Sequence, residues 1–255
     1  MLTALTRKAS SALANCELSF IERKPIDMEK ARAQHRAYEE MLVRLGARVI
    51  SLPEEPELPD SMFVEDPALV LDELAVIFPL GSAARRKEAE SIATALEKYR
   101  TLCHVKLPGM MEGGDVLRVG RKLFVGLTKR TNAEGIRQLA VLLEPYRYEV
   151  TAVRVNGCLH LKSAVTFLGG NTLLGNRAWF DARRLEAFDW VDVDPTEPHA
   201  ANALALGDAV VFPASYPKTT ERIAEKGFRV LLLDISELQK AESGLTCSSL
   251  LFEAP

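Results

Sequence analysis

Residues 116–125 read Val-Leu-Arg-Val-Gly-Arg-Lys-Leu-Phe-Val, with two short β-prone runs on either side of Gly120 and Arg121. Turn residues between two such runs predict a β-hairpin. The same order of apolar run, turn and apolar run occurs three more times, in residues 69–78, 165–174 and 204–212. The hairpin is therefore a repeated unit, and its recurrence limits the folds that the chain can adopt.

A second pattern, in which a helix ends and a strand begins, precedes each hairpin. Asp27 can cap a helix because apolar residues follow it at spacings of three and four, and Gly46 suits the helix end. These apolar residues are Met28, Ala31, Tyr38, Leu42 and Leu45. Residues 48–52 then read as extended, and residues 223–232 repeat the pattern near the other end of the chain. Three weaker strand-like copies lie between them, in residues 103–107, 148–153 and 190–193.

These five strands recur at a regular interval. Their centres, near Val49, Val105, Val150, Val191 and Val230, are 56, 45, 41 and 39 residues apart. Repeats of roughly 40–50 residues with strands and a helix indicate a propeller-like ring. A fifth hairpin is complete only if residues 2–5 pair with a strand at residues 248–252, which would close the ring through the two chain ends. We predict one α/β domain over residues 1–255, a five-bladed, pseudo-symmetric α/β-propeller.

One other architecture also alternates helices and strands, the doubly wound α/β sheet. That sheet is mostly parallel, whereas each repeat here contains a hairpin, whose two strands are antiparallel. The hairpins therefore favour the ring.

Composition excludes several classes of function. The chain of 255 residues has 32 Lys and Arg against 35 Asp and Glu, a net charge of −3, which excludes a strongly basic nucleic-acid-binding protein. The longest stretch without a charge, residues 163–176, has 14 residues, fewer than the ~20 apolar residues of a membrane span. No secretory signal is recognised, and four scattered cysteines suit a reducing compartment. We expect a cytoplasmic protein without a nucleic-acid or membrane partner and, because the four histidines lack zinc-ligand spacing, without a structural metal.

Polar residues precede the hairpins, where a ring would bring its repeats together at the axis. They include Glu65, Asp66, Glu112, His160 and Cys247. A thiolate can act as a nucleophile, and an imidazole can transfer protons near neutral pH. Neighbouring carboxylates suit a flat guanidinium cation through paired hydrogen bonds, whereas an ester or peptide would require donors for its oxyanion. The pattern predicts attack on a guanidinium carbon.

Five motifs in order carry a family resemblance. They are Glu65-Asp66-Pro67, Glu-Gly-Gly-Asp-Val at residues 112–116, Gly-Leu-Thr-Lys-Arg-Thr-Asn at 126–132, His-Leu-Lys-Ser at 160–163 and Leu-Thr-Cys-Ser-Ser-Leu at 245–250. Together they resemble the dimethylarginine dimethylaminohydrolases, guanidino-modifying members of the pentein superfamily, whose fold is a ring of five ββαβ-type units. The resemblance spans essentially the whole chain.

The resemblance implies a role for each candidate residue. Cys247 would be the nucleophile, His160 the acid–base and Glu112 the third member of a triad, while Asp66 would hold the guanidinium nitrogens. The amino-acid end of the substrate would be lined by Leu18, Asp60, Glu65, Arg85, Arg130 and the main chain at Ala241. The local departures are Thr246 before the cysteine and Ala241 where the family often has a larger aliphatic residue, which affects substrate preference more than chemistry.

The resemblance further implies hydrolysis of Nω-methylated L-arginine, mono- or asymmetric dimethylarginine, to L-citrulline and methylamine or dimethylamine. A covalent thiouronium on the cysteine would be the intermediate, and no cofactor or metal would be needed. One alternative is an arginine deiminase or amidinotransferase, but these usually carry an Asp two residues after the histidine, where this chain has Lys162. Another is a non-catalytic pentein binding protein, against which the presence of the thiol, imidazole and carboxylate together argues.

Two arginines provide a clue that is independent of the resemblance. Ser82 can cap a helix with Arg85 in its first turn, and a capping box of Thr131 and Glu134 would place Arg130 just before another helix. A cation near a helix N-terminus is unfavourable by ~0.3–1 kcal/mol because it opposes the helix dipole. An α-carboxylate ligand would be favoured by both the arginines and the helix ends, which would explain why the arginines are there.

Smaller points complete the expectations. Asp115 is expected to bond the backbone of its own tight turn, and residues 11–25 could form a lid over the pocket. The sequence leaves open a homodimer and the role of His199.

Overall fold

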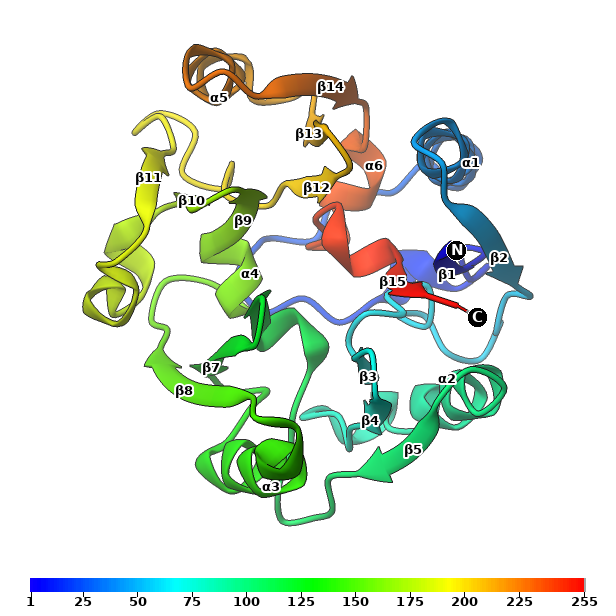
Figure 1. Cartoon of the computed structure of the whole chain (residues 1–255). Coiled ribbons are helices and arrows are strands. Elements are labelled where there is room, and N and C mark those ends of the chain that lie inside the picture. Colours follow the sequence, from blue (N-terminus) through cyan, green and yellow to red (C-terminus); the bar gives the residue numbers. More distant parts are fainter. Residues whose placement is uncertain (255) are drawn as a thin grey trace.

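The computed structural model describes residues 1–254 of the chain, in which five three-stranded sheets are arranged in a ring (Figure 1). In each sheet the first strand is antiparallel to the second, and the second is parallel to the third. Four sheets use consecutive strands: β3 (Ala68–Val70), β4 (Leu74–Ile77) and β5 (Thr101–His104); β6 (Val116–Val119), β7 (Lys122–Leu127) and β8 (Glu149–Arg154); β9 (Val165–Gly169), β10 (Thr172–Gly175) and β11 (Asp189–Asp192); and β12 (Leu204–Leu206), β13 (Ala209–Pro213) and β14 (Arg229–Leu233). The predicted hairpins are confirmed in all four.

The fifth sheet closes the ring with both ends of the chain. It contains β15 (Leu250–Glu253), β1 (Leu2–Arg7) and β2 (Arg48–Leu52). Leu5 lies opposite Leu250 in an antiparallel pair, and the terminal amine of Met1 donates to the carbonyl of Ala254 at 2.7 Å. Figure 1 shows the two termini beside each other at this sheet. The predicted five-bladed α/β ring and its closure are therefore confirmed.

Helices connect the second strand to the third in four units and lie on the outer rim (Figure 1). They are α1 (Met28–Arg44), α2 (Glu88–Leu96), α3 (Ala133–Leu143) and α5 (Pro217–Glu225). Asp27 caps α1 as predicted, because its side chain accepts the N–H of Lys30 at 3.0 Å. Gly46 then takes a φ of +89°, which glycine adopts without strain. No helix in residues 1–254 has the length and apolar character needed to cross a membrane.

The third unit lacks the helix that the repeat predicts. Its second and third strands are joined by two 3₁₀ turns, η5 (Arg177–Trp179) and η6 (Ala182–Leu185). Between them Phe180 is extended and forms a bridge with Val155 of the preceding unit. The side chain of Asn176 also accepts the N–H of Ala178, which favours a tight local turn. This connection therefore does not continue as a helix.

Both predicted helix caps next to the arginines are wrong. Ser82 precedes a 3₁₀ turn, η2 (Ala83–Arg85), and its hydroxyl donates to Glu17 instead of capping α2. Arg85 consequently lies before α2 and not in its first turn. Asn132, not Thr131, caps α3 by accepting the N–H of Gly135 at 2.8 Å. In both places a hydrogen bond to a distant segment competes with the local cap.

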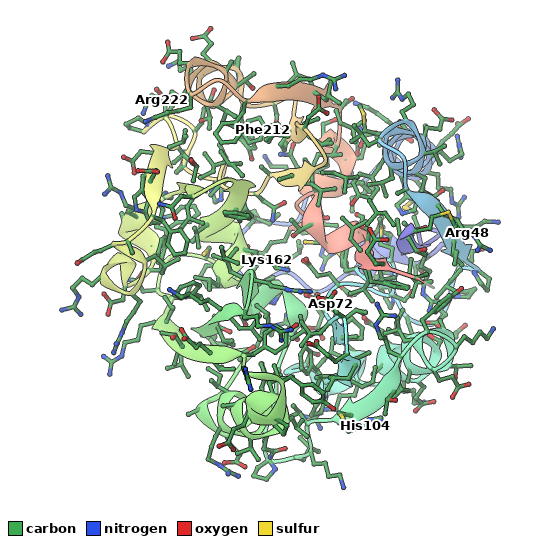
Figure 2. The ribbon with its side chains drawn as sticks, viewed as in Figure 1. Arg48, Asp72, His104, Lys162, Phe212 and Arg222 are labelled. Atoms are coloured by element: carbon green, nitrogen blue, oxygen red, sulfur yellow. The ribbon has the colours of Figure 1, made fainter. Side chains whose placement is uncertain are left out.

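The apolar core is divided among the units. Each of five core clusters joins residues of two neighbouring units; in one, Tyr38 and Leu42 of α1 pack with Leu206 and Val211 of the neighbouring sheet. Burying apolar surface between units leaves the axis of the ring free for polar side chains. Lys162, for example, lies near the middle of the ring, whereas Arg222 and His104 lie toward its rim (Figure 2).

Candidate active site

A cavity of about 540 Å³ lies at the axis, and two of the predicted catalytic side chains line it. Cys247 is in a 3₁₀ turn, η7 (Thr246–Ser248), that leads into β15. His160 precedes the short helix α4 (Leu161–Ala164) and β9. Glu65, just before β3, lines the same cavity. Three different units thus supply a thiol, an imidazole and a carboxylate to one space.

Glu112 holds the imidazole from behind. Its Oε2 lies 2.7 Å from His160 Nε2, and its side chain is 0% exposed. Burial lowers the pKa of His160, but the carboxylates of Asp66, Asp115 and Glu112 outweigh burial and raise it to about 9. Burial likewise raises the pKa of Glu112, yet the hydrogen bond and charge of His160 lower it overall. The pair is therefore an imidazolium and a carboxylate at neutral pH, and Nδ1 is the nitrogen left for proton transfer.

Gly114 allows the imidazole to lie against the backbone. A Cβ at this position would lie 2.5 Å from His160 Nδ1 and 3.0 Å from Asp66 Oδ1. Any larger residue would displace the ring, so the Glu-Gly-Gly-Asp motif combines a carboxylate with the space that its histidine partner needs.

The thiol of Cys247 has a raised pKa and is protonated at neutral pH. Burial and the carboxylates of Glu65 and Asp66 raise its pKa to about 12. Two groups act in the opposite direction: the N–H of Gly244, which donates to Sγ at 3.4 Å, and the nearby charge of Lys162. Both groups line the cavity, and within residues 1–254 no hydrogen bond joins Sγ to His160.

Asp66 lies behind the cavity in a buried ionic cluster. Its Oδ2 accepts from Arg85 Nη1 at 3.0 Å, and its Oδ1 accepts the N–H of Gly114 at 3.2 Å. Arg85 also donates to both carboxylate oxygens of Glu88. Asp66, Glu112 and His160 bring ligand-type atoms within 4.8 Å of one another, but each already bonds a protein partner. We interpret this set as a hydrogen-bond network, and the absence of a required metal stays a prediction.

Lys162 forms an ion pair with Glu65 across the axis. Glu65 also accepts from the hydroxyl of Thr246 at 2.9 Å. A second cavity, of about 390 Å³, lies among residues of the first strands of the five sheets. Lys162, Glu65 and Thr246 line both cavities, so these three side chains form a polar partition between them.

The residues predicted for the amino-acid end do not line the cavity, except Glu65. The predicted residues that lie outside the cavity lining are Leu18, Asp60, Arg85, Arg130 and Ala241. Segment 17–20 is bonded to this group: Glu17 N donates to Asp60 at 3.1 Å, and its carboxylate pairs with Arg130 at 3.1 Å. The N–H groups of Ser19 and Phe20 donate to Glu242, the residue after Ala241. Their substrate-binding role stays a prediction.

One local prediction near the site is wrong, and one residue was missed. Asp115 does not bond its own turn: it accepts the N–H of Leu161 at 2.9 Å and the hydroxyl of Thr128 at 2.8 Å, which anchors α4. Burial raises its pKa to about 6. Asn202, in the polar segment before the fourth hairpin, lines the cavity without having been assigned a role. Only its position before a hairpin marked it in the sequence.

Comparison with known proteins identifies the family. The model of the family described as N,N dimethylarginine dimethylhydrolase, eukaryotic, matches residues 7–172. The N(G),N(G)-dimethylarginine dimethylaminohydrolase of Pseudomonas aeruginosa is 36% identical, over 89% of this chain and 90% of that protein. The protein of the same name from Streptomyces coelicolor is 37% identical, over 96% and 95%.

A solved structure agrees with these sequence matches. The Pseudomonas aeruginosa enzyme, as a cysteine-to-serine variant in complex with citrulline, has a TM-score of 0.94 and 33% identity, and the match covers 99% of this chain and 100% of that one. The resemblance carried by the five motifs is thus confirmed by sequence and by fold. The chain belongs to the dimethylarginine dimethylaminohydrolase family.

Proposed function

We propose that this protein hydrolyses Nω-methylated L-arginine to L-citrulline and methylamine or dimethylamine. The observation that carries the proposal is the shared cavity, into which Cys247, the Glu112-supported imidazole of His160 and the carboxylate of Glu65 are brought from separate units. The family's named relatives and a structure with citrulline support this substrate class.

The first step is addition of sulfur to the guanidinium carbon. A thiol with a pKa of about 12 is a poor nucleophile at neutral pH. A guanidinium bound beside it favours the thiolate, because an opposite charge nearby stabilises the charged form. The substrate cation therefore helps the thiol to release its proton to solvent. The sulfur electron pair then forms the C–S bond while the π electrons of the C=N bond move onto nitrogen.

His160 then moves protons in both halves of the reaction. As an imidazolium it protonates the departing amine, and the C–N bond breaks to leave a thiouronium on Cys247. The neutral imidazole next takes a proton from water, whose oxygen adds to the thiouronium carbon. The adduct then collapses: its C–S bond breaks, the C=O bond of citrulline forms, and the hydroxyl proton restores the thiol. Glu112 stabilises the imidazolium throughout, and the cycle uses no cofactor.

Substrate binding is assigned to the remaining predicted residues. Asp66 would orient the guanidinium nitrogens together with Glu112, and Glu65 would contribute to the amino-acid end. Leu18, Asp60, Arg85, Arg130 and Ala241 would receive the amino-acid end. Because segment 17–20 bonds to Asp60 and Arg130, this end of the site becomes accessible when the segment shifts.

Lys162 distinguishes this proposal from arginine deimination or amidino transfer. It stands at the sequence position where those enzymes usually carry a second guanidinium-binding Asp, and its ammonium forms an ion pair with Glu65. A non-catalytic binding role would need neither the thiol nor the buried imidazolium. The four free thiols suit a reducing cytoplasm, and one catalytic domain acting alone or as a homodimer completes the proposal.

Citrulline and amine release, assayed across arginine and its methylated forms, test the proposal. We expect turnover of the methylated forms and little ammonia from arginine. Cys247→Ser should abolish turnover while it retains substrate binding, measured by calorimetry. Citrulline formation by a clean Cys247→Ser preparation would overturn the nucleophile assignment, and preferred turnover of unmethylated arginine would favour deimination.

A further inference from the structure

Asn202 connects the loop of the nucleophile to the helix that follows the acid–base residue. It lies between β11 and β12, is 7% exposed and lines the active-site cavity. Its partners come from the units before and after its own: Lys162 of α4 on one side, and Leu245 and Thr246 on the other. One side chain thus contacts three consecutive units at the axis.

The amide of Asn202 uses all of its hydrogen-bonding capacity. Its Oδ1 accepts the N–H groups of Leu245 at 2.7 Å and Thr246 at 3.1 Å. Its Nδ2 donates to the carbonyl of Lys162 and to Thr246 Oγ1, both at 3.0 Å. Since two backbone N–H groups face one end and a carbonyl faces the other, the amide has only one satisfied orientation. A buried amide with four partners is held rigidly.

Asn202 also packs against the residue that contacts the catalytic sulfur. A Cβ on Gly244 would lie 2.4 Å from both Cγ and Oδ1 of Asn202, so the backbone at Gly244 rests directly on this side chain. The N–H of Gly244 in turn donates to Cys247 Sγ at 3.4 Å. Asn202 therefore contacts the residue whose N–H is hydrogen-bonded to the sulfur.

We propose that Asn202 is a positioning residue for the reaction: it fixes loop 244–247 relative to α4 and so sets the separation between Cys247 and His160. No hydrogen bond joins those two groups in the described residues, whereas the Asn202 amide bonds both the loop that carries the sulfur and the helix that follows the imidazole. The proposal rests on the catalytic roles given above. It adds the residue that holds their geometry.

Steady-state kinetics of Asn202→Ala and Asn202→Asp test this role. Displacements of about 1 Å in an active site cost roughly 10²-fold in rate, so we expect kcat to fall about 10- to 100-fold while KM changes less than threefold. Asn202→Asp keeps the acceptor but loses both donors, so its kcat should lie between those of the wild type and Asn202→Ala. Asn176 provides a matched control. Its side chain connects its own turn, through the N–H of Ala178, to the carbonyl of Pro198 in another loop, and it lies outside the cavity. Asn176→Ala should retain kcat.

A second measurement does not depend on the substrate. The rate of alkylation of Cys247 by iodoacetamide, followed against pH by peptide mass spectrometry, reports the environment of the sulfur. In both Asn202 variants the profile should shift, because the Gly244 donor is displaced. If the wild type hydrolysed no guanidino compound, the proposed function would be wrong. The alkylation profile would still show whether Asn202 controls the environment of the sulfur.

A double variant separates positioning from general loss of stability. Gly244→Ala should damage activity because its Cβ meets Asn202. Asn202→Ala removes the two 2.4 Å contacts with Cγ and Oδ1 and leaves one of 2.9 Å with Cβ, so part of the clash is relieved and the effects on kcat should be non-additive. Additive effects would contradict the contact. Wild-type kcat and an unchanged alkylation profile in Asn202→Asp, which keeps the shape of the side chain, would overturn the proposal even if Asn202→Ala were unstable.

Discussion

The protonation state of His160 depends on its carboxylate neighbours. Glu112 contributes both a hydrogen bond and a charge to the rise of its pKa to about 9. Glu112→Gln removes that charge, so the pKa of the imidazole should fall and the imidazolium needed to protonate the leaving amine should be lost at a lower pH. We expect kcat to fall about 10²-fold and the alkaline limb of its pH profile to move to lower pH.

The control for this prediction is Glu134→Gln, on the exposed surface of α3, which pairs with Arg137 away from the cavity. Its pH profile should match the wild type. If the alkaline limb of Glu112→Gln stayed in place, a different group would control the acid step.

At the residue scale, motif chemistry predicted the groups that can react. The polar residues before the hairpins, together with the family resemblance, indicated Cys247, His160 and Glu112. The structure places Cys247 and His160 in one cavity and bonds Glu112 to His160, while their catalytic roles stay a prediction. Asn202 could not be chosen in this way. Its partners at Lys162, Leu245 and Thr246 are backbone groups or a hydroxyl 40 or more residues away, and no local pattern encodes such bonds.

At the element scale, segment 17–20 places an internal carboxylate on Arg130. Glu17 pairs with this arginine, which is also the proposed partner of the substrate's α-carboxylate, so the two carboxylates would compete. Glu17→Gln should lower KM for a methylated arginine about two- to fivefold, the range expected from a partly exposed ion pair. Initial-rate kinetics measure the change.

A substrate without the α-carboxylate provides the control. For a methylated guanidine of this kind, such as a decarboxylated methylarginine, Glu17→Gln should leave KM unchanged because no competition is relieved. An equal fall in KM for both substrates would instead mean that Glu17 controls access to the whole cavity.

Elements with strong local signals were predicted closely, and those that depend on distant contacts were not. Asp27 and Gly46 mark the two ends of α1 as predicted. The side-chain cap of Asp27 and the positive φ of Gly46 both depend on the residues next to them in the sequence. Thr131 failed as a cap because its hydroxyl accepts the N–H of Glu112 at 3.1 Å. That bond holds the backbone of Glu112, the predicted catalytic carboxylate, so a contact at the site replaces the local cap.

On the scale of the whole molecule, the repeat was predictable and its irregularities were not. The spacing of hairpins encodes the ring because each unit buries its apolar faces against its neighbours. The third unit replaces its helix with 3₁₀ turns because Phe180 pairs with Val155, a contact between units. Sequence periodicity thus shows how many units surround the axis but not which polar side chains fill it.

The ion pair between Lys162 and Glu65, in the polar partition at the axis, should contribute to the free energy of unfolding. The side chains of Lys162 and Glu65 are 13% and 11% exposed, and removing one member of such a pair leaves a buried charge. Lys162→Met should therefore lower the free energy of unfolding by about 3 kcal/mol, measured by urea denaturation at pH 8. Glu65→Gln added to it should recover most of the loss.

The pH dependence of Lys162→Met distinguishes a lost charge from lost packing. Burial raises the pKa of Glu65, and the Lys162 charge opposes that rise; without Lys162 the pKa of Glu65 should climb further above its unfolded value. The folded state then binds a proton that the unfolded state lacks, so stability relative to wild type should increase as pH falls from 8 toward 5. Lys162→Met combined with Glu65→Gln should lack this dependence. A deficit that stayed constant with pH would mean that the lysine contributes through the packing of its alkyl chain alone.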